Sequence, residues 1–352
     1  MGMYLVATGE WASMAASGKT ITLLDVARRA GVSTATVSRV VNDPAKVGAA
    51  TRDRVHKAID ALGYTPHFGG RLLAAGRSNT IGAVIPTMAS AIFAGGLQAF
   101  QEVLTQAGKT LLVASTDYDP AQELAQIRTL VARGAEGLLL VGADRLAETR
   151  DFLARRRTPH VVTWSHADAG GSLCVGFDNR RAAREMTQTV LGFGHRRLAM
   201  ISGIGTHNDR VRDRQDGVAQ AVAACTGAML SPLIEVPYDP ASGAEAFRRI
   251  MAAPLRPTAL ICGNDVLAAG VLRAARQMGI AVPAEVSVVG FDDIDLASLV
   301  CPALTTVRVP QMQMGRAAVE LLLDLVAGRS DRGSILLETE IVIRASLAPP
   351  PR

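Results

Sequence analysis

Short polar side chains and three arginines (Arg28, Arg29 and Arg39) lie between residues 22 and 42, which read TLLDVARRAGVSTATVSRVVN. Hydroxyl and amide groups such as those of Thr22, Ser33 and Asn42 are suited to hydrogen bonds with phosphate oxygens. Arg39 carries a planar fork of donors, which can hold a phosphate or pair with the edge of a guanine. The side chains of this segment therefore have the chemistry needed to contact a nucleic acid duplex.

Two short helices can present these groups. Thr22 is a capping residue ahead of a first predicted helix at Leu23–Ala30, and Gly31 can end that helix in a tight turn. Ser33 is the capping residue of a second predicted helix at Thr34–Val41. The spacing of caps and glycine thus predicts a helix, a turn and a second helix.

The small and apolar residues of this segment predict how the two helices pack. Ala27 is small where the helices cross, and Val32 and Val37 can lock the pair together. A third helix at residues 50–62 completes a small all-α head. We expect a helix-turn-helix whose second helix enters a major groove. The residues that we expect to face DNA on this helix are Thr34, Ala35, Thr36, Ser38 and Arg39.

The charge distribution agrees with a polyanion as the partner of this head. Residues 20–78 contain nine Lys or Arg and four Asp or Glu, which accounts for the whole net charge of +5. The rest of the chain sums to zero. A basic surplus confined to one region is typical of nucleic acid binding, although a solvated helical surface can carry one too.

Several other classes of site are not favoured by the sequence. The cysteines form no CxxC pair and have no histidine at metal-ligand spacing; they are Cys174, Cys225, Cys262 and Cys301. We therefore expect reduced thiols, a cytoplasmic location, no metal site and no cofactor. The sequence contains no apolar run of about 18 residues, so no membrane-spanning helix is predicted. Residues 1–19 do not resemble a secretory signal and are predicted to be a flexible extension.

Two other functions stay open as alternatives. A sugar-processing enzyme is disfavoured because the GxxxxGK[ST] and GxSxG motifs and a metal-spaced histidine cluster are missing. A solute-binding sugar receptor without DNA function would need neither the head nor its basic surplus. The sequence therefore favours a regulator over an enzyme.

After residue 79 the pattern changes to apolar runs alternating with amphipathic helices. The runs predict strands at residues 81–86, 110–115, 137–142, 160–164, 173–177, 198–202, 233–237, 259–262 and 286–291. Helices are predicted at residues 93–107, 121–133, 180–192, 209–224, 241–252 and 266–278. Strands that are apolar on both faces and alternate with helices indicate parallel sheets. Their number suits two sheets with a ligand between them, at the carboxyl ends of the strands.

The stretch from Thr22 to Asn42 closely resembles the head of the lactose-repressor-type (LacI/GalR) transcriptional regulators. Its relatives read much like TLxDVAxxAGVSxxTVSRVVN, and the likeness continues through Thr51–Pro66 and over about 330 residues in all. The resemblance implies a helix-turn-helix head at 20–66, a hinge helix or linker at 67–79 and a core at 80–347, followed by a tail at 348–352. Within the core it implies a first subdomain of about 80–177 and 308–335, and a second of about 178–307 and 336–347.

The resemblance also implies how DNA is bound. The family's hinge leucine, matched here by Leu73, wedges into the minor groove and kinks the duplex. Gly69 and Gly70 cost roughly 1 kcal/mol each in a helix, so we expect this hinge to fold less readily than an alanine-containing one. A symmetric homodimer on near-palindromic double-stranded operator DNA is expected, and no tetramer-forming heptads are seen.

The core resembles the periplasmic-binding-protein-like sensor of the same family, with two parallel-sheet, Rossmann-like subdomains. The positions that match the family's effector contacts are Phe93, Arg214, Asn264 and Asp292, and Trp164 is a fifth residue expected at the effector site. Trp164 replaces an aspartate of many relatives, and the chain is similar here to the gluconate-operon-repressor subgroup. The resemblance implies a regulator, most simply a repressor, of a carbohydrate or sugar-acid operon. It leaves the operator sequence open, and also whether the effector releases or recruits DNA binding.

Overall fold

The computed structural model describes residues 21–65, 78–166, 171–329 and 331–351. Contacts divide the chain into two compact units, Met1–Ser78 and Asn79–Arg352. Each unit has its own hydrophobic core and is described by itself. The predicted extension at 1–19 and most of the predicted hinge, including Leu73, lie outside the described residues.

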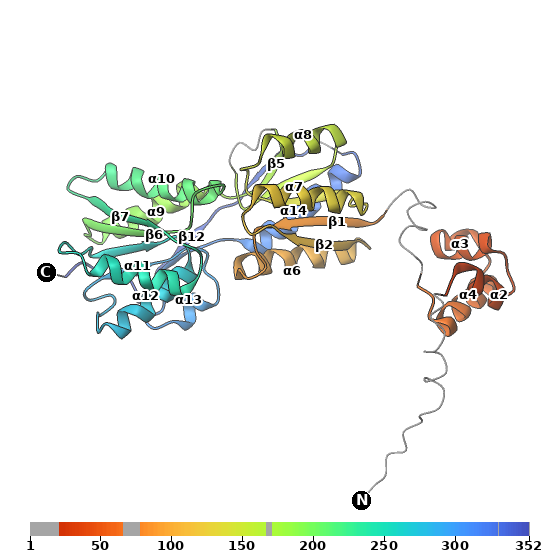
Figure 1. Ribbon diagram of the computed structural model, residues 1–352, viewed down its shortest axis with the longest axis horizontal. Coiled ribbons are helices and arrows are strands. Elements are labelled where there is room, and N and C mark those ends of the chain that lie inside the picture. The colour runs from red at the N-terminus through yellow and green to blue at the C-terminus, as the bar shows by residue number, and fades with distance from the viewer. Residues whose placement is uncertain (1–20, 66–77, 167–170, 330, 352) are drawn as a thin grey trace, which may run out of the picture. The chain divides into compact units, whose positions relative to one another are not determined.

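Helices alone make up the described part of the first unit (Figure 1). They are α2 (Leu23–Ala30), α3 (Thr34–Asn42), the 3-10 turn η1 (Pro44–Lys46) and α4 (Ala49–Leu62). Gly31 follows α2 with a φ of +62°, a left-handed conformation that suits glycine. The core of the head includes Val26, Val37 and Val55, which are fully buried. The predicted all-α head is confirmed, with boundaries within a residue of those expected.

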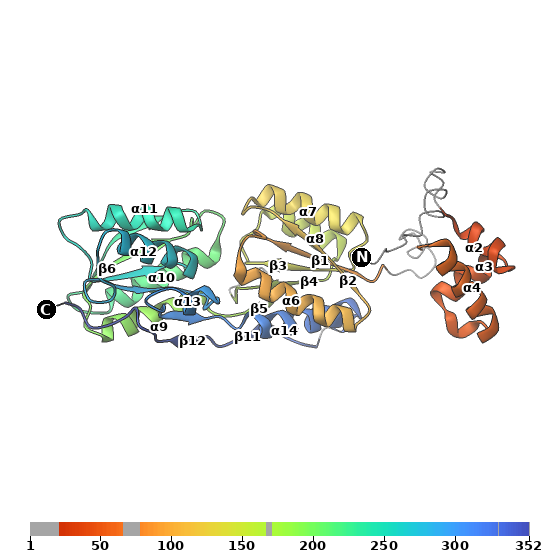
Figure 2. The same cartoon turned by 90° about the horizontal axis from the view of Figure 1, so that it is seen from below.

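The first lobe of the second unit is a parallel sheet with helices on both faces (Figure 2). Its strands are β1 (Thr80–Ile85), β2 (Thr110–Ser115), β3 (Gly137–Val141), β4 (His160–Thr163), β5 (Leu173–Gly176) and β11 (Ile335–Leu336). Its helices are α6 (Ala91–Gln106), α7 (Pro120–Ala132), α8 (Ala147–Arg156) and α14 (Gln311–Val326). The strand order is β11-β5-β4-β3-β1-β2. Helices α7 and α8 cover one face, and α6 and α14 pack together on the other.

The second lobe repeats this architecture around a smaller parallel sheet (Figure 1). Its strands are β6 (Arg197–Ser202), β7 (Met229–Glu235), β8 (Ala259–Cys262) and β9 (Ser287–Val289), in the order β7-β6-β8-β9. Its helices are α9 (Asn179–Gly192), α10 (Asp209–Ala223), α11 (Pro240–Met251), α12 (Asp265–Gln277) and the short α13 (Leu296–Leu299). The pair α9–α10 lies on one face and the pair α11–α12 on the other.

The chain passes between the two lobes after β5, again before α14, and once more after β11. Strand β10 (Thr306–Arg308) pairs with β12 (Glu340–Val342) in an antiparallel ribbon along this path. Buried side chains of both lobes, such as Trp164 and Phe291, belong to one continuous apolar cluster. The predicted two-sheet core is confirmed. In both sheets the carboxyl ends of the strands point toward the space between the lobes. A ligand site is therefore expected there.

Some elements differ from the sequence prediction. Helices α8 and α14 and strands β10 to β12 were not predicted, and β7 begins at Met229 rather than at Leu233. Side chains along β7 alternate between exposed and half-buried, because this strand lies at the edge of its sheet. Pro232 within it is tolerated at an edge, where its missing N–H costs no ladder hydrogen bond.

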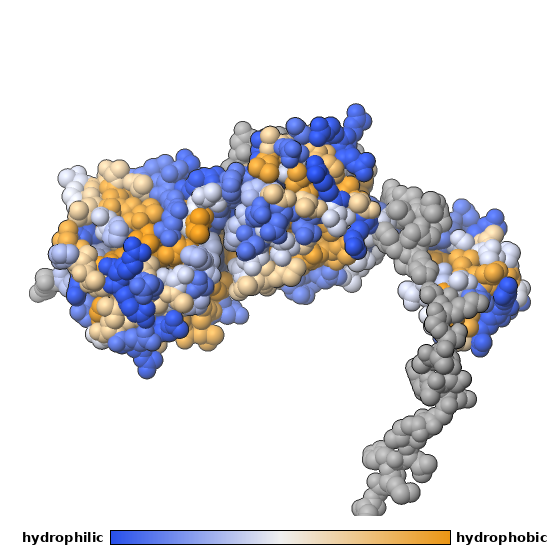
Figure 3. All heavy atoms as spheres, in the orientation of Figure 1, coloured by the Kyte–Doolittle hydropathy of each residue, from blue (hydrophilic) through white to orange (hydrophobic). Residues whose placement is uncertain are grey.

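The outer surface of the described residues is mixed in character. Polar residues and scattered apolar ones share the face drawn in Figure 3. No helix in the described part of the chain is both long and apolar enough to cross a membrane.

Candidate functional site

Helix α3 is held at its start by its own side chains. The Ser33 hydroxyl accepts a hydrogen bond from the Thr36 backbone N–H at 3.1 Å and lies 2.9 Å from the Thr36 hydroxyl. Val37 and Val40 are buried against the other helices of the head. The opposite face of α3 is consequently the one left toward solvent.

The predicted DNA-facing residues of α3 differ in how exposed their side chains are to solvent. Thr34, Ala35 and Arg39 are exposed, while Thr36 and Ser38 are half-buried. Among the described residues, the Arg39 guanidinium has no hydrogen-bond or ion-pair partner. Its five donors are thus available to a partner such as DNA.

Two residues predicted to contact phosphate, Thr22 and Asn42, already make hydrogen bonds within the head. The Asn42 amide donates to the Ser38 carbonyl at 2.9 Å and lies 3.2 Å from the Ser38 hydroxyl. Both the backbone N–H and the hydroxyl of Thr22 donate to the Asp25 carboxylate, at 2.9 and 2.6 Å. These bonds fix the ends of α2 and α3, and a phosphate would have to compete with them. The remaining predicted residue, Leu73, is not among the described residues.

A cavity of about 750 Å³ lies between the two lobes of the second unit. All five predicted effector residues line it. Phe93 and Trp164 come from the first lobe, and Arg214, Asn264 and Asp292 come from the second. Residues more than 100 positions apart in the sequence are brought together here because both sheets turn their carboxyl ends to the cleft.

Arg214 is fixed from several sides. Its Nη1 donates to the Gly263 carbonyl at 2.7 Å, and its Nε donates to the Arg210 carbonyl at 3.3 Å. The guanidinium lies over the Phe291 ring, 4.4 Å from the ring centre. This cation–π contact and the two hydrogen bonds preorganise the guanidinium toward the cavity.

Asp292 faces Arg214 at an Nη1–Oδ1 distance of 3.9 Å, which is too long for a hydrogen bond. Its backbone has a φ of +114° and is held by a hydrogen bond from its N–H to the Val307 carbonyl. The residue is only 8% exposed. Burial raises the pKa of its carboxyl to about 7, and Arg214 only partly opposes that rise.

Asn264 lines the cavity and also caps a helix. Its Oδ1 accepts a hydrogen bond from the Leu267 N–H at 2.9 Å and so caps α12. This bond orients the amide, and its Nδ2 remains the group that can donate to a ligand.

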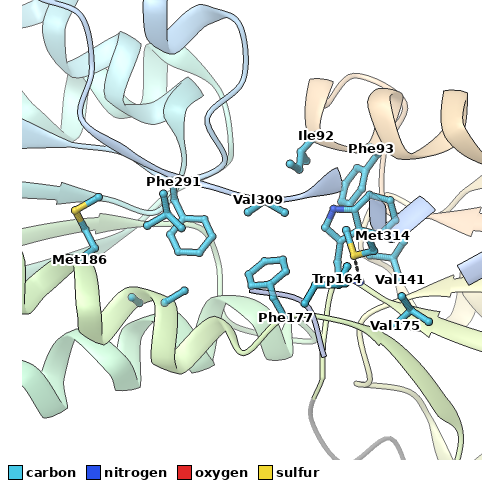
Figure 4. Close-up of a cluster of buried hydrophobic side chains, with 14 of the residues drawn as sticks. Ile92, Phe93, Val141, Trp164, Val175, Phe177, Met186, Phe291, Val309 and Met314 are labelled. Carbon is cyan, nitrogen blue, oxygen red and sulfur yellow. Dashed lines mark hydrogen bonds between the residues drawn. The ribbon is translucent and has the colours of Figure 1, made fainter. Parts of the chain in front are cut away.

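An aromatic corner forms the first-lobe wall. The rings of Phe93 and Trp164 meet edge to face with centres 5.2 Å apart (Figure 4). Trp164 has a φ of +59°, and a Cβ on Gly96 would come within 2.4 Å of its indole. Gly96 therefore leaves the space in which the ring lies. Aromatic faces of this kind stack on the apolar faces of sugars and similar rings.

The structure adds cavity residues that were not predicted. They are Arg210, one helical turn before Arg214 on α10, together with Asn179, Tyr118 and Tyr238. The i, i+4 spacing of the two arginines was a usable signal, since it puts both on one face of a helix. Tyr118 and Tyr238 follow the ends of β2 and β7, and only the three-dimensional fold brings their rings to 6.5 Å.

Comparison with known proteins places both units. The family model described as "Bacterial regulatory proteins, lacI family" matches residues 22–67. The model described as "Periplasmic binding protein-like domain" matches residues 187–347.

Whole-length relatives agree with these matches. The HTH-type transcriptional repressor CytR of Escherichia coli K12 is 33% identical over 328 residues, covering 92% of this chain and 96% of that protein. The HTH-type transcriptional regulator GntR of Pseudomonas aeruginosa is also 33% identical over 328 residues, covering 92% and 95%.

Solved structures show the same likeness. The lac repressor dimer bound to operator and the anti-inducer ONPF superposes with a TM-score of 0.82 at 26% identity, covering 94% of this chain and all of that one. The transcriptional regulator CelR in complex with cellobiose gives a TM-score of 0.68 at 28% identity, covering 93% and 99%.

Proposed function

This chain belongs to the LacI family of bacterial regulatory proteins, and from that premise we propose that it is a homodimeric repressor of a carbohydrate or sugar-acid operon. It is a DNA-binding transcriptional repressor with an effector-binding domain, and it is not an enzyme. The proposal concerns the finer points: its operator, its effector and its assembly.

One observation carries the proposal. The same chain holds an exposed Arg39, without a partner among the described residues, on a helix of a helix-turn-helix. In its second unit it holds a cavity of about 750 Å³ lined by Arg214 and Asp292. The first is suited to reading base edges, and the second is suited to a small polar ligand. A protein with both can convert the concentration of a metabolite into occupancy of DNA.

The mechanism that we propose links the cavity to the head. A ligand in this cavity touches both lobes, so it favours the arrangement in which the lobes are close together. Two heads in a symmetric dimer bind the two halves of a near-palindromic operator in the cytoplasm, where the DNA lies. The segment 67–79, with Leu73 as the minor-groove wedge, joins the two units and would transmit the change.

The proposed effector class is a sugar or sugar acid. Aromatic rings at Phe93 and Trp164 suit the apolar faces of a polyol. Arg214 offers the fork of donors that suits a carboxylate or paired hydroxyls. The resemblance to the gluconate-operon-repressor subgroup and the cellobiose complex of one structural neighbour support this class.

The test begins with selection of DNA sites from a random duplex library by the full-length protein. We expect a near-palindromic site, which is then labelled for fluorescence anisotropy. Sugars, sugar acids and sugar phosphates are added in turn, and at least one should change the affinity by tenfold or more. Failure to enrich any duplex, or a DNA affinity that no compound alters, would sink the proposal.

A further inference from the structure

A buried arginine, Arg210, and a half-buried one, Arg214, line the cavity from one face of α10. Arg210 lies one turn before Arg214, and its residue exposure is 6%. Its Nη1 contacts the Asp209 carboxylate at 3.1 Å. Within the described residues, Nη2 of neither arginine has a hydrogen-bond partner. Each guanidinium thus keeps donors for a ligand in the cavity.

The charges around Arg210 are already balanced. Asp209 accepts a hydrogen bond from the Ala143 N–H at 2.9 Å, and the pKa of its carboxyl is lowered by Arg210 and these hydrogen bonds against the opposing effect of burial. Arg145 pairs with Glu123 at 3.2 Å. These two pairs are neutral as a group. The other charged residues of the cavity wall are Arg214, Asp292, Asp117 and Asp239.

Asp292 makes no hydrogen bond to a cationic side chain within the described residues, and its ion pair with Arg214 is long. Arg214 is 3.9 Å away and donates to the Gly263 carbonyl instead. Asp265 of α12 is a second buried acid, and burial together with the charge of Asp292 raises the pKa of its carboxyl to about 8. Tyr118 and Tyr238 are neutral phenols near pH 7, and burial raises the pKa of both further.

The remaining charges near Asp292 are committed elsewhere or lie at the rim. Asp293 is paired with Arg308 at 2.7 Å and with Arg344 at 2.6 Å. Asp117 and Asp239 line the cavity as well, and Asp239 accepts hydrogen bonds from Ser242 at the start of α11. A protonated Asp292 would leave the half-buried Arg214 without an ion-pair partner among the described residues.

Resting on the proposed function, we infer that Arg210 and Arg214 together hold the single negative charge of an aldonate-type effector, and that Asp292 takes up a proton when this effector binds. An ionised Asp292 beside the incoming carboxylate would place two like charges in a buried site, which is unfavourable. Protonation removes that repulsion and gives Asp292 a donor for the ligand. Sites that interact in this way are coupled reciprocally, so proton and effector raise each other's affinity.

The experiment is calorimetry of the full-length protein with gluconate between pH 6 and pH 8.5, in buffers of different ionisation enthalpy. The carboxyl of gluconate is ionised throughout this range. Above about pH 7 its affinity should fall toward tenfold per pH unit, with uptake approaching about one proton per site. Glucose, which is neutral, should show neither effect.

Three variants separate the roles. In Asp292→Asn, gluconate binding should persist and lose its pH dependence. In Arg210→Gln, gluconate should bind at least about tenfold more weakly, while glucose changes less. The double variant Asp209→Asn/Arg210→Gln keeps the charge balance if the single variant folds poorly. Arg248→Gln on α11 removes a charge outside the cavity and should match the wild type.

Several results would overturn the inference. They are glucose binding without gluconate binding, gluconate affinity that is flat with pH, and proton uptake that survives in Asp292→Asn. Tighter binding of 6-phosphogluconate than of gluconate would contradict the single negative charge. Each of these leaves DNA selection and its response to other sugars intact, so failure of the proposed function is recognised separately.

Discussion

Arg39 is the only long cation on α3, and the exposed residues before it, Thr34 and Ala35, are short. Short side chains let a helix approach base edges closely but reach few of them. Sequence discrimination through this helix should therefore depend heavily on one guanidinium.

We predict that Arg39→Ala weakens binding to the selected operator by about 1–3 kcal/mol, or roughly fivefold to 150-fold. The reason is the loss of a bidentate contact with a base or of a fixed phosphate contact. Anisotropy titrations at constant salt measure the effect, with Arg248→Ala on α11 as the control for a lost positive charge. Equal losses in both variants would show that Arg39 contributes only general charge.

Asp292 offers a prediction about stability. Burial raises the pKa of this carboxyl from 3.8 to about 7, so the folded protein binds the proton more tightly than the unfolded chain. The stability that this provides is full below about pH 4 and is lost as pH rises through 7. Asp292→Asn cannot ionise, and we expect its free energy of unfolding at pH 8 to exceed that of the wild type by on the order of 4 kcal/mol.

Denaturant unfolding of both proteins at pH 4 and pH 8 checks this prediction. The advantage of the asparagine variant should be confined to the higher pH. A variant that is less stable by the same amount at both values would mean that Asp292 acts through packing and not through its charge.

At the scale of elements, the start of α10 touches the loop after β3 across the cleft. Asp209 accepts the Ala143 N–H at 2.9 Å, and Arg212 pairs with Asp144 at 2.8 Å. Gly142 has a φ of +73°, and a Cβ there would fall 1.6 Å from the Arg210 guanidinium. Glycine therefore suits position 142 for two reasons: the positive φ and the lack of space for a Cβ.

We predict that Gly142→Ala pushes the lobes apart and weakens effector binding at least tenfold. Gly108→Ala is a matched control, because Gly108 has a φ of +65° with no atom near its would-be Cβ. Both variants should lose about 1 kcal/mol of stability from backbone strain. Binding of the compound identified by the anisotropy screen is then measured calorimetrically. Similar affinities in the two variants would rule out this contact as a determinant of closure.

At the scale of the whole molecule, the sequence predicted more of the head than of the cavity. Caps and glycines are local signals, so Ser33 and Gly31 placed α2 and α3 within a residue. Helix α8 was missed because few of its side chains are buried, Thr149 and Leu153 fully, which leaves a weak apolar period. In α14 the helical spacing of apolar residues is clear, with Met314 and Ala318 one turn apart and both buried. This helix could have been predicted from the sequence.

The cavity depended on long-range contacts. Arg214 and Asp292 were placed by family resemblance, and the sequence alone could not give the 3.9 Å between them. Tyr118 and Tyr238 come from different lobes and share no sequence signal. Burial of Asp292, which sets its protonation, is likewise a property of the folded cleft.

The proposed dimer leads to a prediction about operator geometry. A single head reads one half-site, and two heads joined in one dimer bind the second half-site at a raised effective concentration. Affinity for the full site should therefore exceed that for a single half-site by about a hundredfold or more. Inserting five base pairs between the halves rotates one by about half a helical turn and should abolish most of this gain.

Anisotropy with the full site, one half-site and the respaced site measures these affinities at one fixed salt concentration, since phosphate contacts make them salt-dependent. Sedimentation at the same protein concentrations shows whether the chain is dimeric there. A dimer that binds all three duplexes equally would mean that its heads act independently. A monomer that shows the full preference for the intact site would contradict the proposed assembly, because one head cannot sense the spacing of two halves.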